Sequence, residues 1–599
     1  MSYYGTYNAK HFSPTQVAES FIPCAEYYQL RQLDSTVLLG ARGSGKTTLM
    51  KMLTPEGNSK LKDKTPSITT DLPFWGIYIP TDIQWHHQLK YSDNLLVNFP
   101  TFSKLVSKAA VTLNILISVV ECMEALLAIG ELKTEQEPEI AELMLHNWKL
   151  GSGLPKFSKV KRLLYSCFND LTFFVNKKIH NKLPDSAEGL PDFVFIEYLS
   201  AISSVLSSVQ EHLITVKKWA LCFDELEMAP LWLQEELFTQ LRCLPNAFVY
   251  KLSTAPIPLV VTSTSPSPTN DYSIVRVWPQ GIDDRFEFCE KLCRSLIYKK
   301  FNKNIAPKQL FGKSFVYQKD GNTASENYSA GSVTTQYIRL VAENDPSLRR
   351  LLSAHGIDWK HPFTTDVKKR DQVLRKLKPI VYQKVACLKW DKEGHQISRS
   401  RKIIDDIYSG TEAIYKISDG NPRRLIAIVN QMLEVAEIDK NGTPKPISPE
   451  TQASVLNDKS RRFSAYIRGI PESIITEEKG YISLFGVIKK IAEFFYNSIV
   501  TSETTLDPPG SFTIDSKVDE SYIRLLKVAL DHGIIVLVDP FTETIESSLK
   551  EKRYRLSYML APAFKLPLRL YSSVNLTSML RAQKISSKIK YEQIEILFD

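Results

Sequence analysis

The segment DSTVLLGARGSGKTTLM at residues 34–50 constrains the fold of this chain more than any other stretch. A short apolar run at residues 36–39 favours a β-strand, and residues 48–53 suit a helix. The glycines between them allow backbone conformations that residues with a Cβ avoid. Successive amide N–H groups can therefore converge on an anion at the positive end of the helix. The order strand, turn and helix predicts a phosphate-binding loop.

The spacing G-x-x-x-x-G-K-[ST] in this segment is that of a P-loop. We expect Lys46 to contact the β- and γ-phosphates of a nucleotide and the Thr47 hydroxyl to bind Mg²⁺. The residues predicted to hold the nucleotide are Gly40, Ala41, Arg42, Gly43, Ser44, Gly45, Lys46, Thr47 and Thr48. Upstream aromatic and aliphatic residues available to line an adenine pocket are Phe21, Ile22, Tyr27 and Tyr28.

A P-loop needs acidic partners, and the run WALCFDELE at residues 219–227 supplies them. The run is apolar up to Asp224 and Glu225, as expected when a buried parallel strand presents two carboxylates at its carboxyl end. We expect Asp224 to bind Mg²⁺ and Glu225 to polarise the attacking water. The alternative is a strand that ends in an exposed acidic turn, which also contains Glu227.

The next predicted strand, residues 247–252, ends at two polar residues, Ser253 and Thr254. A polar side chain there would lie between the P-loop and the acidic strand and contact the γ-phosphate or its water. Both residues are candidates, and Ser253 is predicted as a nucleotide contact. The guanine signature N-K-x-D is missing, because residues 181–184 and 302–305 both lack the final aspartate. ATP is therefore favoured over GTP.

The chain has 599 residues, which is too long for one core and predicts about three or four domains. Its net charge of +9 permits nucleic-acid binding without requiring it. Eight cysteines without metal-ligand spacing indicate a reduced, cytoplasmic location. The most apolar stretch, residues 109–130, contains Asn114, Glu121 and Glu124, which favours a buried helix over a membrane span.

Roughly 180 residues separate Lys46 from Asp224, far more than the one or two βα units of a compact nucleotide domain. Helical periodicity at residues 105–129, 139–149 and 193–216 fills much of this interval. We therefore predict a helical insertion over about residues 85–215.

The P-loop, the acidic strand and the later SDGNPRRL at residues 418–425 together resemble the AAA+ ATPases, above all their origin-recognition initiator clade. In that clade a G-x-x-R segment opens a helix of the lid domain, and its arginine reaches the γ-phosphate. The resemblance implies this catalytic and nucleotide-binding role for Arg423. Gly420 and Pro422 mark a helix start, and a guanidinium fits phosphate oxygens. The alternative is a capped helix with Arg423 and Arg424 solvated.

The chain departs from that clade in two places. Initiators usually carry asparagine where this chain has Ser253 and Thr254. AAA+ rings also place an arginine finger after this strand, yet residues 260–273 contain no arginine. The candidate substitutes for the arginine finger are Arg242, Arg285 and Arg294, and the sequence does not rank them.

The C-terminal part resembles a winged helix, a common DNA-docking unit. Helices are predicted at residues 481–500 and 520–532, and strands at residues 511–515, 533–538 and 553–559. The basic residues expected on the wing are Lys550, Lys552, Arg553 and Arg555. A winged helix that contacts protein instead of DNA is the alternative.

The predicted fold is α/β, with an AAA+ nucleotide domain at residues 1–283, a helical lid at 284–445 and a winged-helix-like domain at 446–599. Lid helices are expected at residues 371–388 and 403–417. The expected function is an oligomeric ATP- and Mg²⁺-dependent switch that hydrolyses ATP and assembles on DNA or on a partner protein, without a membrane. One alternative is the ATPase subunit of a bacterial antiphage defence system that controls a separate effector. Another is a nucleotide-binding scaffold with little turnover.

Overall fold

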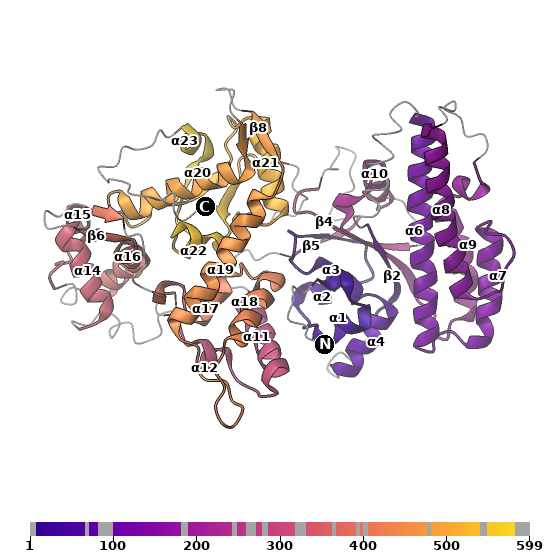
Figure 1. Cartoon of the computed structure of the whole chain (residues 1–599), viewed down its shortest axis with the longest axis horizontal. Helices are drawn as coiled ribbons and strands as arrows, with labels where there is room; N and C mark the ends of the chain where they lie inside the picture. Colours follow the sequence, from indigo (N-terminus) through magenta and orange to yellow (C-terminus); the bar gives the residue numbers. More distant parts are fainter. Residues whose placement is uncertain are drawn as a thin grey trace.

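The structure is a computed structural model. It describes residues 8–65, 71–81, 100–180, 190–241, 248–258, 271–277, 285–314, 316–317, 331–361, 367–390, 396–398, 405–475, 481–539, 545 and 548–581. A helical bundle lies at one end, the N-terminal sheet lies next to it, and the lid and C-terminal domain follow (Figure 1). The P-loop and the acidic strand both belong to that sheet.

The N-terminal sheet has five strands in the order β2-β3-β4-β1-β5, and all their pairings are parallel. The strands are β1 (Thr36–Leu39), β2 (Phe74–Pro80), β3 (Lys218–Asp224), β4 (Phe248–Thr254) and β5 (Ser273–Arg276). The predicted α/β fold is confirmed. Because the pairings are parallel, the carboxyl ends of β1, β3 and β4 meet at one edge, where Asp224 faces the P-loop region.

Both faces of the sheet are covered, which explains why its strands are apolar along their length. On β3, Cys222 packs with the N-terminal helices, whereas Leu221 and Phe223 pack with the inserted bundle. The helices on the first face are α1 (Pro14–Ser20), α2 (Ala25–Leu30), α3 (Lys46–Lys51) and α4 (Pro55–Lys64), preceded by the 3-10 turn η1 (Ala9–His11).

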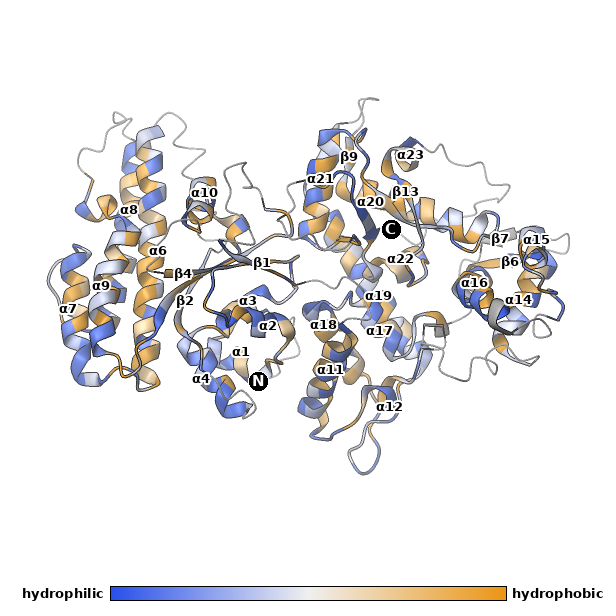
Figure 2. Cartoon of the chain, turned by 180° about the vertical axis from the view of Figure 1, so that it is seen from behind, coloured by the Kyte–Doolittle hydropathy of each residue, from blue (hydrophilic) through white to orange (hydrophobic). Residues whose placement is uncertain are grey.

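The inserted bundle consists of α6 (Pro100–Ala128), α7 (Glu137–Asn147), α8 (Phe157–His180) and α9 (Tyr198–His212). Helix α8 was not among the helices predicted from the sequence. Helix α6 has the length and hydropathy of a membrane span, yet 78% of its most apolar window is buried in the protein. The hydrophobic residues of α6 are evident in Figure 2.

The polar residues of α6 have partners within the bundle. Lys161 of α8 pairs with Glu121 and Glu124 at 3.1 and 2.9 Å. The Asn114 amide donates to the carbonyl of Ala110 one turn earlier, at 2.9 Å. The burial of the apolar window of α6 confirms the prediction of a buried helix.

The lid consists of α11 (Phe286–Phe301), α12 (Pro307–Phe311), α17 (Thr411–Ile417) and α18 (Pro422–Glu434). A single helix predicted over residues 403–417 is wrong in the described part: η6 (Asp405–Tyr408) and α17 are separated there by a short turn. Gly410 in that turn has φ 86° and lies against the backbone of Ser314, an approach that leaves no room for a Cβ.

A second helical segment interrupts the lid and lies at the end of the molecule opposite the bundle (Figure 1). It contains α14 (Val333–Asn344), α15 (Pro346–Ala354) and α16 (Val367–Cys387), followed by the hairpin of β6 (Leu388–Trp390) and β7 (Gln396–Ser398). The Lys384 ammonium of α16 donates to Asp345 Oδ2 and to the carbonyl of Ser502, both at 3.0 Å. The predicted lid helix at residues 371–388 thus belongs to a segment anchored on the C-terminal domain.

The C-terminal domain contains a four-stranded sheet in the order β11-β12-β10-β13. Its strands are β10 (Pro509–Thr513), β11 (Ile535–Leu537), β12 (Arg553–Leu556) and β13 (Ser572–Asn575), and its helices include α19 (Pro449–Arg468), α20 (Leu484–Tyr496) and α21 (Glu520–Asp531). Helix α20, strand β10, helix α21 and the β11–β12 hairpin follow one another in the predicted order. Strand β13 adds a parallel edge beside β10.

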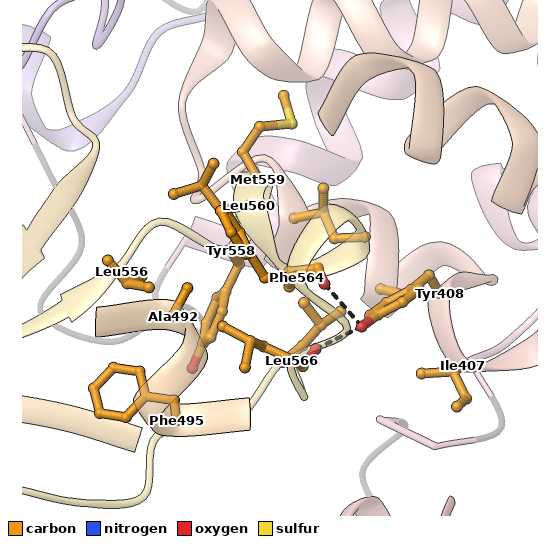
Figure 3. Close-up of a cluster of buried hydrophobic side chains, with 14 of the residues drawn as sticks. Ile407, Tyr408, Ala492, Phe495, Leu556, Tyr558, Met559, Leu560, Phe564 and Leu566 are labelled. Carbon is orange, nitrogen blue, oxygen red and sulfur yellow. Dashed lines mark hydrogen bonds between the residues drawn. The ribbon is translucent and has the colours of Figure 1, made fainter. Parts of the chain in front are cut away.

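The lid and the C-terminal domain share one apolar core (Figure 3). Tyr408 of η6 is fully buried there, and its hydroxyl lies 3.0 Å from the carbonyl oxygen of Ala561 and 2.7 Å from that of Leu566. Phe495 and Tyr558 belong to the same cluster. The shared core fixes the C-terminal domain against the lid.

Asp419, the residue before the glycine of the G-x-x-R segment, joins the same two domains through charge. Its carboxylate accepts hydrogen bonds from Arg424 at 2.6 Å, Arg555 at 2.8 Å and the Ser557 hydroxyl at 2.5 Å. Arg555 is only 5% exposed, so its predicted place on the wing surface is wrong. Arg553 is also engaged internally, since it donates to Ser511 Oγ at 2.8 Å.

Asp419→Asn tests this buried carboxylate. Asparagine tolerates the left-handed backbone of residue 419 (φ 54°), so the variant removes charge with little change of shape. Two buried guanidinium groups then lose their anion, and we expect a loss of about 3 to 5 kcal/mol in the free energy of unfolding, measured by urea denaturation. In the control, Glu437→Ala removes an exposed ion pair with Lys445 and should cost less than about 0.5 kcal/mol. Equal losses in the two variants would contradict the assigned role.

Candidate nucleotide-binding site

The P-loop connects β1 to α3 and contacts the first turn of the lid helix α18. Gly43 and Gly45 have φ of 82° and 103°, in the left-handed region that favours glycine. A Cβ on Gly43 would lie 3.1 Å from Asn421 Oδ1 and 3.3 Å from the Cβ of Arg423. The Asn421 amide also donates to the carbonyl of Arg42 at 3.2 Å. Glycine is therefore needed both for the turn and for the close approach of the lid.

Lys46 begins α3 and is buried, with its side chain folded over the loop. Its ammonium donates to the carbonyl of Gly40 at 2.6 Å and lies 3.8 Å from Glu227 Oε1. Burial raises the pKa of Glu227, whereas Lys46 opposes that shift. The Lys46 ammonium thus lies between the P-loop backbone and Glu227, which follows β3.

Asp224, at the carboxyl end of β3, is 1% exposed and accepts two side-chain hydrogen bonds. The Tyr78 hydroxyl of β2 donates to it at 3.0 Å and the Ser253 hydroxyl of β4 donates at 2.9 Å. A buried carboxylate held on both sides differs from the exposed acidic turn that the sequence left open. The hydrogen bonds from Tyr78 and Ser253 hold the Asp224 carboxylate in one orientation.

Glu225 follows in the left-handed conformation, with φ 57°, which is uncommon for a residue with a side chain and turns it away from the strand direction. Its carbonyl accepts a hydrogen bond from Thr81 Oγ1 at 2.5 Å, and its carboxylate forms an ion pair with Lys10 of η1. The first contact holds the backbone of Glu225, and the ion pair holds its side chain at the cavity that the P-loop also lines.

Ser253 and Thr254 are the last two residues of β4, which lies between β3 and β1 as predicted. Ser253 is fully buried and its hydroxyl donates to Asp224, so the structure places it behind the carboxylate and not on the cavity surface. The carbonyl of Thr254 accepts a hydrogen bond from the amide of Gly40 at 3.2 Å. The direct nucleotide contact predicted for Ser253 stays a prediction, and in the structure its hydroxyl serves the neighbouring carboxylate of β3.

Two adjoining cavities flank the P-loop, with volumes of about 460 Å³ and about 660 Å³. Both are within the size range of small-ligand sites. The smaller one is lined by residues 41–48 together with Glu225, Glu227 and Arg423. The residues that line both cavities are Ser44, Gly45, Thr48, Pro422 and Ile426. The two hollows therefore meet at the helix start that follows the P-loop.

The larger cavity extends between the N-terminal helices and the lid helix α11. Phe21, Ile22 and Tyr28 line it as predicted for a base pocket, whereas Tyr27 is fully buried beneath. Phe288 and Leu292 of α11 line the opposite side. An apolar hollow beside a phosphate loop has the chemistry that a nucleobase and ribose require.

Arg423 and Arg424 diverge from the start of α18. Arg423 lines the smaller cavity, and one guanidinium nitrogen donates to Asn8 Oδ1 at 3.4 Å. Burial and the nearby Arg42 lower the pKa of Arg423. Arg424 turns the other way and is bound to Asp419. The alternative of two solvated arginines is therefore wrong.

The arginine-finger substitutes have partners within the chain. Arg285 forms an ion pair with Glu26, and Arg294 pairs with Glu290 one helical turn earlier at 2.9 Å. Arg242 lies outside the described residues.

The sequence did not point to a contribution from the C-terminal domain. The smaller cavity is also lined by Arg524, Lys527, Val528, Asp531 and His532, from α21 and the residue after it. The amide of Arg42 in the P-loop donates to the carbonyl of Asp531 at 2.8 Å. Only the packing of distant segments places these residues here, so no local motif carries the signal.

The Thr47 hydroxyl and the Asp224 carboxylate are oxygen donors of the kind that Mg²⁺ takes; Thr47 lines the smaller cavity, whereas Asp224 is buried at the end of β3 and is not among its lining residues. This ion takes few protein ligands and completes its shell with water and phosphate oxygens. Among the residues that the structure describes, no three or more His, Cys, Asp or Glu side chains form an all-protein metal site. Buried oxygens of Ser44, Glu227 and Asp531 also have no hydrogen-bond partner among these residues. They border the smaller cavity, as expected around a polar ligand.

The comparison with known families agrees with this geometry. A family model described as ORC-CDC6-like matches residues 2–576, which include the P-loop, the acidic strand, the lid arginine and most of the C-terminal domain. A search of curated proteins finds no significant match. Because the family match spans nearly the whole chain, the protein belongs to the ORC-CDC6-like family of AAA+ P-loop proteins.

Proposed function

We propose that the protein is an ATP-hydrolysing switch, in which ATP binds between the nucleotide domain and the lid and couples its state to assembly on DNA or with a partner protein. One observation carries the proposal: the P-loop, Glu225 and Arg423 border a single cavity, although they come from three separate parts of the chain. A ligand that contacts all three links the lid to the sheet.

Each residue has a distinct role in this proposal. Lys46 and the amides of the P-loop bind the phosphate chain, while Thr47 and Asp224 hold Mg²⁺. The ion, when bound, neutralises charge on the β- and γ-phosphates. Glu225 orients and polarises the attacking water, and Arg423 binds the γ-phosphate from the lid.

The proposal predicts different defects for the phosphate contact and for the water-activating residue. Lys46→Ala should weaken ATP and ADP binding at least about tenfold, because it removes charged hydrogen bonds to phosphate. Glu225→Gln should keep the affinity and lower kcat by about 10² to 10⁴, because it removes general-base assistance.

Fluorescent-nucleotide titration and phosphate release measure the two effects. Glu235→Gln on the exposed face of α10 (Leu231–Gln240) serves as the matched control and should behave as wild type. The same loss of binding in Lys46→Ala and Glu225→Gln would contradict the division of roles.

Arg423 is predicted to couple the nucleotide to the lid. A residue that contacts only the γ-phosphate distinguishes ATP from ADP through that contact, so its removal uncouples the two states. Arg423→Ala should lose about 1.5 to 3 kcal/mol of ATP preference and keep much of its ADP affinity. It should also lose the ATP-dependent change in sedimentation or small-angle scattering.

The control for Arg423 is Arg461→Ala, which removes an exposed arginine of α19. Wild type, variant and control are compared with ADP and with a non-hydrolysable ATP analogue. If Arg423→Ala responds to the analogue as wild type does, Arg423 does not carry the coupling.

Assembly on DNA is tested at the wing. Arg553 and Arg555 bind groups of the protein itself, which leaves Lys550 and Lys552 as the wing residues to change, although Lys550 also pairs with Glu520 at 2.6 Å. Reversing both lysines to glutamate should weaken duplex binding. The slope of log affinity against log salt should fall by about 2, because each phosphate contact contributes about 0.9.

Binding isotherms at several salt concentrations measure the slope, with Lys440→Glu/Lys445→Glu in an exposed turn after α18 as control. If wild type binds neither duplex nor single-stranded DNA at low salt, the C-terminal domain contacts a protein partner instead.

A further inference from the structure

The C-terminal domain forms one wall of the phosphate-side cavity. Arg524 and Lys527 from α21 line that wall, and they carry its positive charge. Asp531 and His532, at the end of the same helix, line it closer to the P-loop, where the Asp531 carbonyl accepts the amide of Arg42 at 2.8 Å. A backbone hydrogen bond thus joins this wall to the P-loop, which binds phosphate in the proposed function.

Contacts with the lid and with α19 fix the end of α21 in this position. Arg424 donates to the carbonyl of Gly533 at 2.8 Å and to that of His532 at 3.5 Å. The Tyr466 hydroxyl of α19 forms a hydrogen bond with His532 Nδ1. Because this end is held from two sides, the side chains one turn earlier keep a defined place along the cavity.

The position of Asp531 places the wall at the terminal-phosphate end of the site. Its carboxyl group interacts electrostatically with Lys527 one turn earlier, and also with Glu227 and Lys46 at the end of β3 and the P-loop. Burial raises the pKa of Asp531 to about 7, while the nearby Lys527 and Lys46 oppose that shift, so near neutral pH the group still carries part of its negative charge. One carboxyl oxygen is buried and has no hydrogen-bond partner among the described residues.

Lys527 lies one helical turn before Asp531, on the same face of α21. It is half-buried, and burial lowers its pKa. Its ammonium forms no hydrogen bond or ion pair within the part of the chain that the structure describes, even though it borders the cavity. A desolvated cation with unused donors beside a phosphate-binding loop has the chemistry to bind a phosphate oxygen.

We propose that Lys527 is a nucleotide-contacting residue, which binds the terminal phosphate of ATP from the C-terminal domain of the same chain. Asp531 opposes this contact, because a carboxylate repels the phosphate that Lys527 attracts. Because ADP lacks the phosphate that Lys527 binds, ATP holds the C-terminal domain against the P-loop more strongly than ADP does. This inference rests on the proposed function and extends it, because it assigns the C-terminal domain a part in distinguishing the two nucleotides.

The test uses the full chain and titrates a fluorescent non-hydrolysable ATP analogue and fluorescent ADP. Lys527→Ala should weaken binding of the analogue about tenfold, because a charged hydrogen bond is lost, and change ADP affinity less than about twofold. Lys527→Arg, which keeps a cation, should recover most of the analogue affinity. Lys490→Ala, an exposed lysine of α20 in the same domain, is the control and should match wild type.

Asp531→Asn should change the preference for the ATP analogue over ADP in the opposite direction to Lys527→Ala. It keeps the backbone carbonyl that Arg42 contacts and removes the negative charge, so the ATP analogue should bind more tightly relative to ADP. Hydrogen exchange over residues 520–531 adds a structural readout. Exchange there should be slower with the analogue than with ADP in wild type, and equal with both in Lys527→Ala.

Two outcomes overturn different claims. If wild type binds both nucleotides and Lys527→Ala binds the analogue equally well, or loses both affinities to the same extent, the role of Lys527 is wrong and the proposed function stands. If wild type binds neither nucleotide, the proposed function fails and the inference fails with it.

Discussion

The buried carboxylate of Asp419 is the interaction on which the arrangement of domains depends. It neutralises Arg424 of the lid and Arg555 of the C-terminal sheet, which would otherwise be two buried cations without an anion. Because Arg424 also binds the backbone after α21, the carboxylate fixes that helix against the lid. The apolar core around Tyr408 supplies the cohesion of this interface, and the charge network sets its geometry.

The start of α18 joins three parts of the protein. Asn421 caps the helix and binds the P-loop, Arg423 lines the phosphate cavity, and Arg424 binds Asp419. Arg423 and Arg424 thus lie on opposite sides of the first turn of α18, one at the cavity and the other at Asp419. Any movement of this turn in response to nucleotide is transmitted at once to the P-loop and to the C-terminal domain, because the same few residues contact both.

The arrangement of polar residues at the carboxyl edge of the sheet depends on its strand order. With β4 between β3 and β1, Ser253 reaches Asp224 while Thr254 binds the P-loop backbone. The buried hydroxyl therefore orients the carboxylate proposed to hold the metal, whereas the phosphate cavity is bordered by charged groups from the lid and α21. The site is composite, and its polarity changes from the apolar hollow beside Phe21 to the charged end beside Glu227.

The sequence by itself determined the P-loop, the acidic strand, the order of the sheet strands along the chain and the buried character of α6. These features depend on local spacing and periodicity, which backbone geometry enforces over a few residues. Only the tertiary structure decided that Ser253 lies behind Asp224, that Arg555 is a buried partner of Asp419, and that α21 borders the phosphate cavity. Such contacts join residues more than a hundred positions apart or on neighbouring strands. Neither composition nor a motif encodes them, because burial and pairing of charge follow from the packed domains.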